Sequence, residues 1–275
     1  SRQQGNATLG RRLGSNLGVR HHSYCASTPA SSDRSGKTPR WLSVDHLEFR
    51  ESWGMMSLTP NTFDHGDKVL LVDSKKRRYL TTLKIGGEFH SHSGFLAHSD
   101  IVGQAEGIVV TSTKGSAYAV LRPTLEDFVV EMPRGAQVIY PKDLAPICMI
   151  ADIGPGVRVF ESGVGSGALS MTMLRYGATI VGYELREEFA NRAQSNVRSF
   201  LGAEASSRFH VQLRDCYEGI DETDLDRIVL DLPEPWRIIP HAHGALRRGG
   251  ILVAYTPSIT QAVQVRQAFG PAWME

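Results

Sequence analysis

The sequence is poor in cysteine, in long apolar runs and in net charge, and each shortage argues against a class of protein. Three cysteines occur among 275 residues, at positions 25, 148 and 216, and none forms a CxxC pair. This spacing argues against a disulfide framework or a structural zinc site, and it predicts a cytoplasmic protein. No apolar run approaches the roughly 18 residues that span a bilayer, so no membrane association is expected. The formal net charge is +1, so a nucleic-acid partner would need a local basic patch.

The first part of the chain differs from the rest in composition. Residues 1–54 contain eight Lys or Arg against four Asp or Glu, are rich in Ser, Gly and Asn, and show little hydrophobic periodicity. Ordered patterning begins near Met55 and Met56. We therefore expect residues 1–56 to be a disordered or non-native extension. A targeting presequence, which is Arg-rich and Ser-rich, is the alternative interpretation, although acidic residues dilute that pattern.

The next part, residues 63–132, has the pattern of antiparallel β-structure. Two apolar segments, 68–72 and 79–83, flank a polar turn and so predict a hairpin. Segments 108–112 and 118–122 flank a turn that contains Lys-Gly-Ser. Short strands separated by glycine-containing turns indicate a small N-terminal antiparallel β-domain.

From residue 138 to residue 275, segments that suit strands alternate with segments of helical length. The expected strands are 158–161, 180–184, 209–213, 227–231 and 250–255. The expected helices are 169–176, 187–201, 237–247 and 260–269. This alternation predicts an α/β domain with a doubly wound, Rossmann-like parallel sheet. Sheets of this class usually carry further strands, so we expect the C-terminal strands of this domain to be truncated.

The most informative segment is the glycine-rich turn after the first strand of this domain. The turn and the start of the helix after it are formed by Gly163, Gly165, Ser166, Gly167 and Ala168. Glycine permits a tight turn and the close approach of a ligand, because no Cβ is in the way. A strand, a glycine turn and a helix N-terminus together form a nucleotide-cofactor cradle. Glu184 ends the second strand about 20 residues after the first glycine, where a carboxylate is expected to bind ribose hydroxyls.

The turn alone does not identify the cofactor, because it also satisfies the dinucleotide pattern GxGxxA. Two neighbouring features favour S-adenosylmethionine. Glu161 lies two residues before the first glycine, where it can meet the amino group of that cofactor. The fourth strand ends in Asp231, and two prolines and Trp236 follow it. Such an acid–proline–aromatic loop faces the target base in nucleobase methyltransferases. These features predict a class I S-adenosylmethionine-dependent methyltransferase domain, and an NAD-binding oxidoreductase is the alternative.

Five segments, spread over more than two thirds of the chain, carry a resemblance to a known family. They are residues 86–94, 121–127, 137–143, 163–167 and 230–236. On these segments, the chain from about residue 63 resembles the TrmI family, the tRNA (adenine(58)-N(1))-methyltransferases, in its bacterial and particularly actinobacterial form. The Tyr-Pro-Lys-Asp and Asp-x-x-x-Pro-Trp motifs are far more specific than the glycines.

The resemblance implies methyl transfer from S-adenosylmethionine to N1 of adenine 58 in the T-loop of tRNA, by in-line displacement on a flipped-out base. It implies that Asp231 accepts a hydrogen bond from the amino group of the adenine and that Tyr140 lies beside the substrate pocket. A homotetramer that binds the T-arm of tRNA, without a metal, is also implied. The residues expected to bind the cofactor are Glu161, Gly163, Gly165, Ser166, Gly167, Ala168, Glu184, Asp215 and Asp231.

Other interpretations of these residues remain open at the level of sequence. The chain could be a methyltransferase with another substrate, or a non-catalytic tRNA-binding subunit, although such subunits lose the glycine turn that is intact here. Asp231 could cap a turn, Asp215 could be a surface acid, and Tyr140 could be a packing residue. The HxH pair at 90–92, with His98, resembles a metal-ligand pattern, but the family resemblance implies that it lies in a loop of the β-domain, and no metal is expected.

Overall fold

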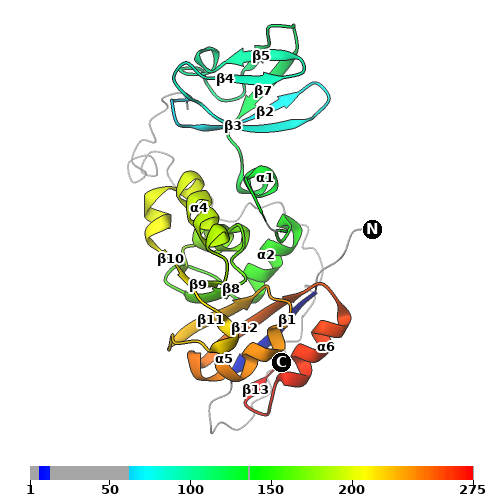
Figure 1. The fold of residues 1–275 in the computed structure, drawn as a ribbon, viewed down its shortest axis with the longest axis vertical. Helices are drawn as coiled ribbons and strands as arrows, with labels where there is room; N and C mark the ends of the chain where they lie inside the picture. The colour runs from blue at the N-terminus through cyan, green and yellow to red at the C-terminus, as the bar shows by residue number, and fades with distance from the viewer. Residues whose placement is uncertain (1–5, 13–61, 136, 275) are drawn as a thin grey trace, which may run out of the picture.

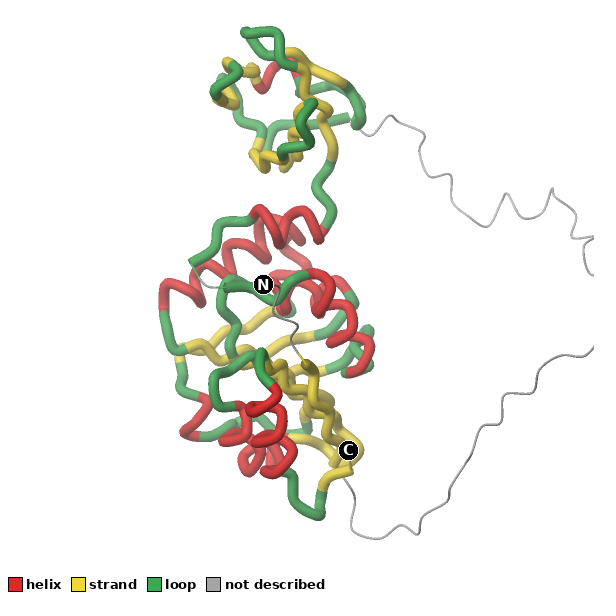
Figure 2. Tube along the Cα trace, turned by 90° about the vertical axis from the view of Figure 1, so that its right-hand side faces the viewer, coloured by secondary structure: helices red, strands yellow, loops and turns green. Residues whose placement is uncertain are grey.

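The computed structural model describes residues 6–12, 62–135 and 137–274 (Figure 1). An N-terminal β-domain and a larger α/β domain follow one another along the long axis, and helix α1 (Leu125–Glu131) lies between them (Figure 1). Helices lie on both sides of the strands of the larger domain (Figure 2). This arrangement confirms the fold class predicted from the sequence, a small antiparallel β-domain followed by a Rossmann-like domain.

The β-domain consists of a four-stranded antiparallel sheet and a separate two-stranded hairpin. Its elements are β2 (Lys68–Asp73), β3 (Arg78–Thr82), β4 (Glu88–Ser91), β5 (Gly94–Ala97), η2 (His98–Asp100), β6 (Val109–Thr111) and β7 (Ala117–Leu121). The order in the larger sheet is β3-β2-β7-β6, and β4 pairs with β5. Phe63, Leu71, Leu96 and Tyr118 lie in one apolar core, so the two sheets pack as one unit.

The larger domain contains five parallel strands that match the predicted ones. They are β8 (Arg158–Ser162), β9 (Thr179–Glu184), β10 (Phe209–Leu213), β11 (Leu225–Leu230) and β12 (Leu246–Thr256). Their order in the sheet is β10-β9-β8-β11-β12. The chain thus adds strands on one side of β8 first and then, from β11 on, on its other side. Ligands of doubly wound sheets bind outside the carboxyl ends of the strands at such a reversal. The fold therefore directs attention to the ends of β8 and β11.

Helices cover both faces of this sheet. They are α2 (Pro141–Ile150), α3 (Ala168–Arg175), α4 (Glu187–Ser207), η3 (Cys216–Glu218), η4 (Pro235–Ile238), α5 (Ile239–Ala245) and α6 (Ile259–Ala268). Successive strand residues point to opposite faces. Val159 of β8 accordingly packs in the core that includes α2, α3 and α4, and Phe160 packs in the core that includes α5 and α6. Both faces of the sheet are therefore buried, as in other parallel sheets.

Two boundaries differ from the sequence-based expectation. Helix α4 extends to Ser207, past the expected end at 201, but Gly202 inside it has φ 87° and ψ −175°. The predicted helix over 237–247 ends at Ala245, and Arg247 already belongs to β12. Strand β12 includes Arg247 and Arg248, which precede its two glycines. The sequence analysis placed Arg247 in the preceding helix.

The structure corrects the expectation that the first residues are disordered. Residues 6–12 form strand β1 (Asn6–Arg12), which pairs antiparallel with β12 and with β13 (Trp273–Met274). An edge strand such as β12 presents unpaired N–H and C=O groups, and backbone pairing with them needs no hydrophobic periodicity. These two strands extend the sheet past its fifth parallel strand. The rest of the predicted extension lies outside the described residues.

Candidate active site

The glycine turn after β8 is forced into its shape by a close backbone contact. Gly163 has φ +86°, and a Cβ at this position would lie 2.0 Å from the carbonyl oxygen of Asp231. No other residue type fits without moving the loop after β11, because the obstacle is backbone. The N–H of Asp231 also donates to the carbonyl oxygen of Ser162, at 2.9 Å. The turn expected to hold a cofactor and the loop expected to hold a substrate are thus in direct backbone contact.

Glu184, at the end of β9, reaches across to the same turn. Its carboxylate accepts hydrogen bonds from the backbone N–H of Gly165 and from that of Arg186, both at 3.0 Å. These two bonds fix the carboxylate beside the turn and leave further lone pairs for a ligand. The structure therefore brings Glu184 and the glycines together, as the sequence predicts.

Glu161 is buried beneath the turn and has an unsatisfied oxygen. Its Oε2 accepts a hydrogen bond from the Oγ of Ser170 at 2.7 Å. Its Oε1 has no hydrogen-bond partner among the described residues, and neither has the buried Oγ of Ser166. Burial, together with the nearby carboxylates of Asp231 and Glu184, raises the pKa of Glu161 to about 8. Unsatisfied buried polar atoms are rare in native proteins and indicate that a ligand completes the site.

A small cleft opens beside the turn. It is lined by Gln137, Val138, Ile139, Gly163, Val164, Gly165, Ser166, Ala168, Leu169 and Asp231. Five of the predicted site residues therefore share one cleft. The sequence analysis did not assign Gln137, Val138 or Ile139 to the site, although they belong to the segment 137–143 that carries the family resemblance.

Asp231 is the acidic side chain among the residues that line this cleft. Burial raises the pKa of its carboxyl group to about 6. The carboxylate is therefore largely ionised at neutral pH and can accept hydrogen bonds from a ligand. Tyr140 follows the cleft residue Ile139, precedes α2 as its N-cap and is 47% exposed, so its ring is available to a molecule that enters from solvent.

Asp215 is placed differently from the other predicted cofactor residues. It follows β10 and caps η3, where its Oδ1 accepts from the N–H of Tyr217 at 2.9 Å. It is not among the residues that line the cleft. Its contact with the adenine of a cofactor stays a prediction.

One group near the site was not found by sequence reasoning. The hydroxyl of Tyr255, in β12, donates to the Oδ2 of Asp143 at 3.3 Å. Asp143 also accepts from the Nζ of Lys142, at 2.8 Å to one carboxylate oxygen and 2.7 Å to the other. Asp143 belongs to the Tyr-Pro-Lys-Asp motif, but its partner is 112 residues away along the chain, so no local pattern could indicate the pair.

The three histidines of the HxH pattern have separate partners. His98 is buried and its Nδ1 accepts from the backbone N–H of Lys84 at 2.9 Å. His92 contacts Arg77, and His90 contacts Glu88. Within the described residues, no cluster of three or more His, Cys, Asp or Glu could hold a metal ion, and no helix is both long and apolar enough to cross a bilayer.

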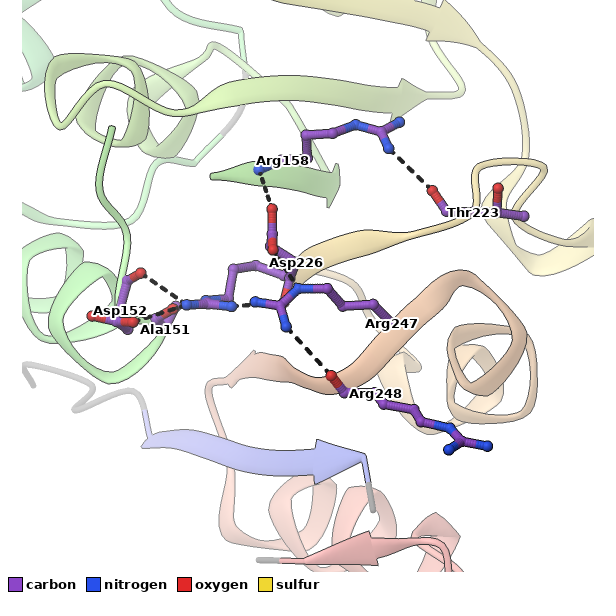
Figure 3. A network of polar contacts seen from close by, with 8 residues as sticks. Ala151, Asp152, Arg158, Thr223, Asp226, Arg247 and Arg248 are labelled. Carbon is purple, nitrogen blue, oxygen red and sulfur yellow. Dashed lines mark hydrogen bonds and ion pairs between the residues drawn. The ribbon is translucent and has the colours of Figure 1, made fainter. Parts of the chain in front are cut away.

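At the opposite edge of the sheet, charged side chains form a network of hydrogen bonds and ion pairs (Figure 3). At the start of β11, the carboxylate of Asp226 accepts from the backbone N–H of Arg158 at 2.8 Å and from the Nε of Arg247. The next residue, Arg227, is buried and donates to the carbonyl oxygen of Ala151 and, at 2.9 Å, to the carboxylate of Asp152. These contacts tie the amino ends of the strands to the residues that follow α2.

Comparisons with known proteins agree with this geometry. The sequence model of a family described as "tRNA methyltransferase complex GCD14 subunit" matches residues 116–273, and a "TrmI-like N-terminal" model matches residues 62–110. The tRNA (adenine(58)-N(1))-methyltransferase TrmI of Thermus thermophilus is 38% identical over 203 residues, which are 73% of this chain and 79% of the relative. A TrmI of Methanocaldococcus jannaschii, named for adenines 57 and 58, is 34% identical over 70% of this chain and 76% of its own.

Solved structures give the same result. A protein of Thermotoga maritima, described as an S-adenosylmethionine-dependent O-methyltransferase, superposes with a TM-score of 0.71 at 32% identity, covering 76% of this chain and 78% of its own. The TrmI of Aquifex aeolicus superposes with a TM-score of 0.66 at 25% identity, covering 76% and 81%. The family model that matches more than half of the chain, and relatives above 30% identity over most of it, show that this chain belongs to the TrmI family of tRNA (adenine(58)-N(1))-methyltransferases.

Proposed function

We propose that this chain transfers a methyl group from S-adenosylmethionine to N1 of adenine 58 in the T-loop of tRNA. The observation that carries the proposal is the half-buried carboxylate of Asp231. This residue lines the cleft, and its backbone contacts the glycine turn. An acceptor at this place is adjacent both to a cofactor on the turn and to a base in the loop after β11. The names of the Thermus and Methanocaldococcus relatives support the same reaction.

The residues of the turn suit S-adenosylmethionine in particular. This cofactor has a cationic amino group, a carboxylate and a ribose, and each needs a different partner. The unsatisfied Oε1 of Glu161 can accept from the amino group directly or through water, and Glu184 can accept from the ribose hydroxyls. Backbone N–H groups in the first turn of α3, which includes the cleft residues Ala168 and Leu169, can donate to the carboxylate. We assign Gly163, Gly165, Ser166, Gly167, Ala168 and Asp215 to the same cofactor.

The bound cofactor supplies an electrophilic methyl group, and adenine N1 has an in-plane lone pair to accept it. No general base is required, because N1 has no proton to lose. Methylation leaves the adenine cationic, and the ionised carboxylate of Asp231 stabilises that charge by accepting a hydrogen bond from the N6 amino group. The main tasks of the protein are therefore positioning and electrostatic stabilisation.

The target adenine must leave the T-loop stack to reach the cleft. We assign Tyr140 to this step, because it follows a cleft residue and its ring is half exposed. An exposed aromatic ring can stack on an extruded base.

We further propose that the protein acts in the cytoplasm as a homotetramer that binds the T-arm, with residues 63–132 as the β-domain and 138–275 as the methyltransferase domain. The formal net charge of +1 supports a tRNA site assembled from several subunits, because one chain has little excess of basic residues.

The proposal is tested by incubating the protein with unmodified tRNA and S-adenosylmethionine, followed by mass spectrometry of the nucleosides and mapping of the modified position. We expect 1-methyladenosine at position 58. Mapping is needed because one relative is named for position 57 as well. If the protein is folded and binds S-adenosylmethionine but the tRNA contains no 1-methyladenosine after incubation, the assignment is wrong.

A further inference from the structure

We propose that the hydrogen bond between Tyr255 and Asp143 positions the two sides of the substrate pocket, one that carries Tyr140 and one that carries Asp231. This inference rests on the proposed function, because it concerns the same pocket. Tyr255 and Asp143 are positioning residues in this account, since they act through Tyr140 and Asp231 and not on the reacting atoms.

The place of Tyr255 follows from the register of the sheet. Strands β11 and β12 are parallel, and Leu230 pairs with Ala254. Asp231 follows Leu230, and Tyr255 follows Ala254. The two residues therefore lie side by side at the carboxyl edge of the sheet. The charge of Asp231 also acts on the Tyr255 hydroxyl, which agrees with this placement.

The place of Asp143 follows from the start of α2. Tyr140 is the N-cap of this helix, and Asp143 is its third residue. The backbone N–H of Asp143 donates to the carbonyl oxygen of Tyr140 at 2.9 Å. The Asp143 side chain accepts from the Tyr255 hydroxyl at 3.3 Å. A chain of hydrogen bonds therefore runs from Tyr140 through Asp143 to Tyr255, which lies next to Asp231.

Apolar packing of Leu144 holds this end of α2 against the core, but no side-chain hydrogen bond caps it. The side chain of Tyr140 makes no capping hydrogen bond, and Pro146 inside the helix provides no backbone N–H. A helix start without a side-chain cap depends on tertiary contacts for its position. The carboxylate of Asp143 also lies in the first turn of α2, where the helix dipole favours a negative charge.

The Tyr255 hydroxyl remains a donor over the physiological range. Burial and the nearby carboxylates of Asp143 and Asp231 raise its pKa to about 12. Lys142 also contacts Asp143, but the side chain of Lys142 is 52% exposed, and exposed ion pairs contribute little. The Tyr255–Asp143 hydrogen bond, and not the contact between Lys142 and Asp143, therefore connects the two sides of the pocket.

Substitutions separate this role from general stability. Tyr255→Phe removes the hydroxyl and keeps the ring, and Asp143→Ala removes the acceptor. We expect each to lower the single-turnover rate of tRNA methylation about fivefold to tenfold, the effect of one ordinary hydrogen bond. The double variant should be no slower than either single variant, because both remove the same contact. Asp143→Asn offers an amide oxygen as acceptor and should restore most of the rate.

The affinity of Tyr255→Phe for S-adenosylmethionine should match that of the wild-type protein, and its melting temperature should fall by no more than about a few degrees, the effect of one hydrogen bond on stability. Tyr176→Phe is the matched control, because Tyr176 is 49% exposed at the end of α3 and should be replaceable without effect. A wild-type rate in Tyr255→Phe, additive losses in the double variant, or a parallel loss of cofactor affinity and melting temperature would each overturn the inference. Absence of methylation by the wild-type protein itself would instead overturn the proposed function and, with it, this inference.

Discussion

The two edges of the parallel sheet differ in whether their buried charged side chains have hydrogen-bond partners. At the amino edge, Asp226 accepts from two arginines and buried Arg227 has both carbonyl and carboxylate partners (Figure 3). At the carboxyl edge, Glu161 has an oxygen without a partner among the described residues, and burial raises the pKa of both Glu161 and Asp231. Asp226 and Arg227 at the amino edge therefore have partners, whereas a carboxylate oxygen of Glu161 at the carboxyl edge has none among the described residues.

This difference separates residues that stabilise the fold from residues that await a ligand. A buried carboxylate oxygen without a partner costs folding free energy, so the unpaired oxygen of Glu161 at the carboxyl edge indicates a function there. Substitutions at the carboxyl edge should change ligand binding and rate, and substitutions at the amino edge should change stability alone.

The largest effect is expected for Asp231→Ala. Removing the carboxylate that stabilises the cationic adenine should lower the rate of methyl transfer about 10²–10³-fold, as for other preorganised electrostatic groups. The affinity for S-adenosylmethionine, measured by calorimetry, should fall much less. In the wild-type protein, the rate should also decline as the pH falls through about 6, because the carboxylate becomes protonated. An equal loss of rate and cofactor affinity would contradict the role given to Asp231.

The next effect concerns Glu161→Gln and the stability of the ligand-free protein. The unfolded chain releases this proton near pH 4.5, whereas the folded protein keeps it until about pH 8. The free energy of unfolding of the wild type should therefore fall as the pH rises between these values. Glu161→Gln lacks this ionisation and should be more stable than the wild type at pH 8 by a few kcal/mol, at about 1.4 kcal/mol per unit of pKa shift.

Denaturant titrations at pH 5 and pH 8 test this expectation. Glu161→Gln should also bind S-adenosylmethionine more weakly, since an amide cannot offer a charge to the amino group. A pH-independent difference between the two proteins would mean that Glu161 is not protonated in the folded, ligand-free protein.

The smallest effect on activity is expected at the amino edge. Arg227→Met leaves the carbonyl oxygen of Ala151 and the carboxylate of Asp152 without this donor and should cost about 1–3 kcal/mol of unfolding free energy. The rate per folded molecule should stay within about twofold, because the site lies at the other end of the strands. Arg248→Gln, in the same region but exposed, is the control and should change stability by less than about 0.5 kcal/mol. A large loss of rate in folded Arg227→Met would show that the two edges are not independent.

Much of the carboxyl edge could be predicted from the sequence because its signals are local. The glycines of the turn, Glu161 and Glu184 lie at fixed offsets from apolar strands, and Asp231 follows a strand directly. Parallel strands then bring these ends together without further information. The family resemblance added Tyr140, which composition and spacing do not distinguish from a packing residue.

The remaining features depend on contacts between distant segments. The partner of Asp143 is Tyr255, and the partners of Arg227 are Ala151 and Asp152, 75–76 residues earlier. Strand β1 was not predicted for the same reason, because it forms by backbone pairing with the edge of β12. Patterns within a short stretch of sequence predict features with local signals, but they do not predict contacts between segments that are far apart in the sequence.

The position of β1 has a consequence for the order of assembly. Asn6 pairs with Thr256 and Arg11 with Ile251, so the first described strand of the chain finds its partner near the last. During synthesis, the β-domain and the first parallel strands emerge long before β12 does. Strand β1 therefore has no partner until β12 has been made, and this side of the sheet can close only then.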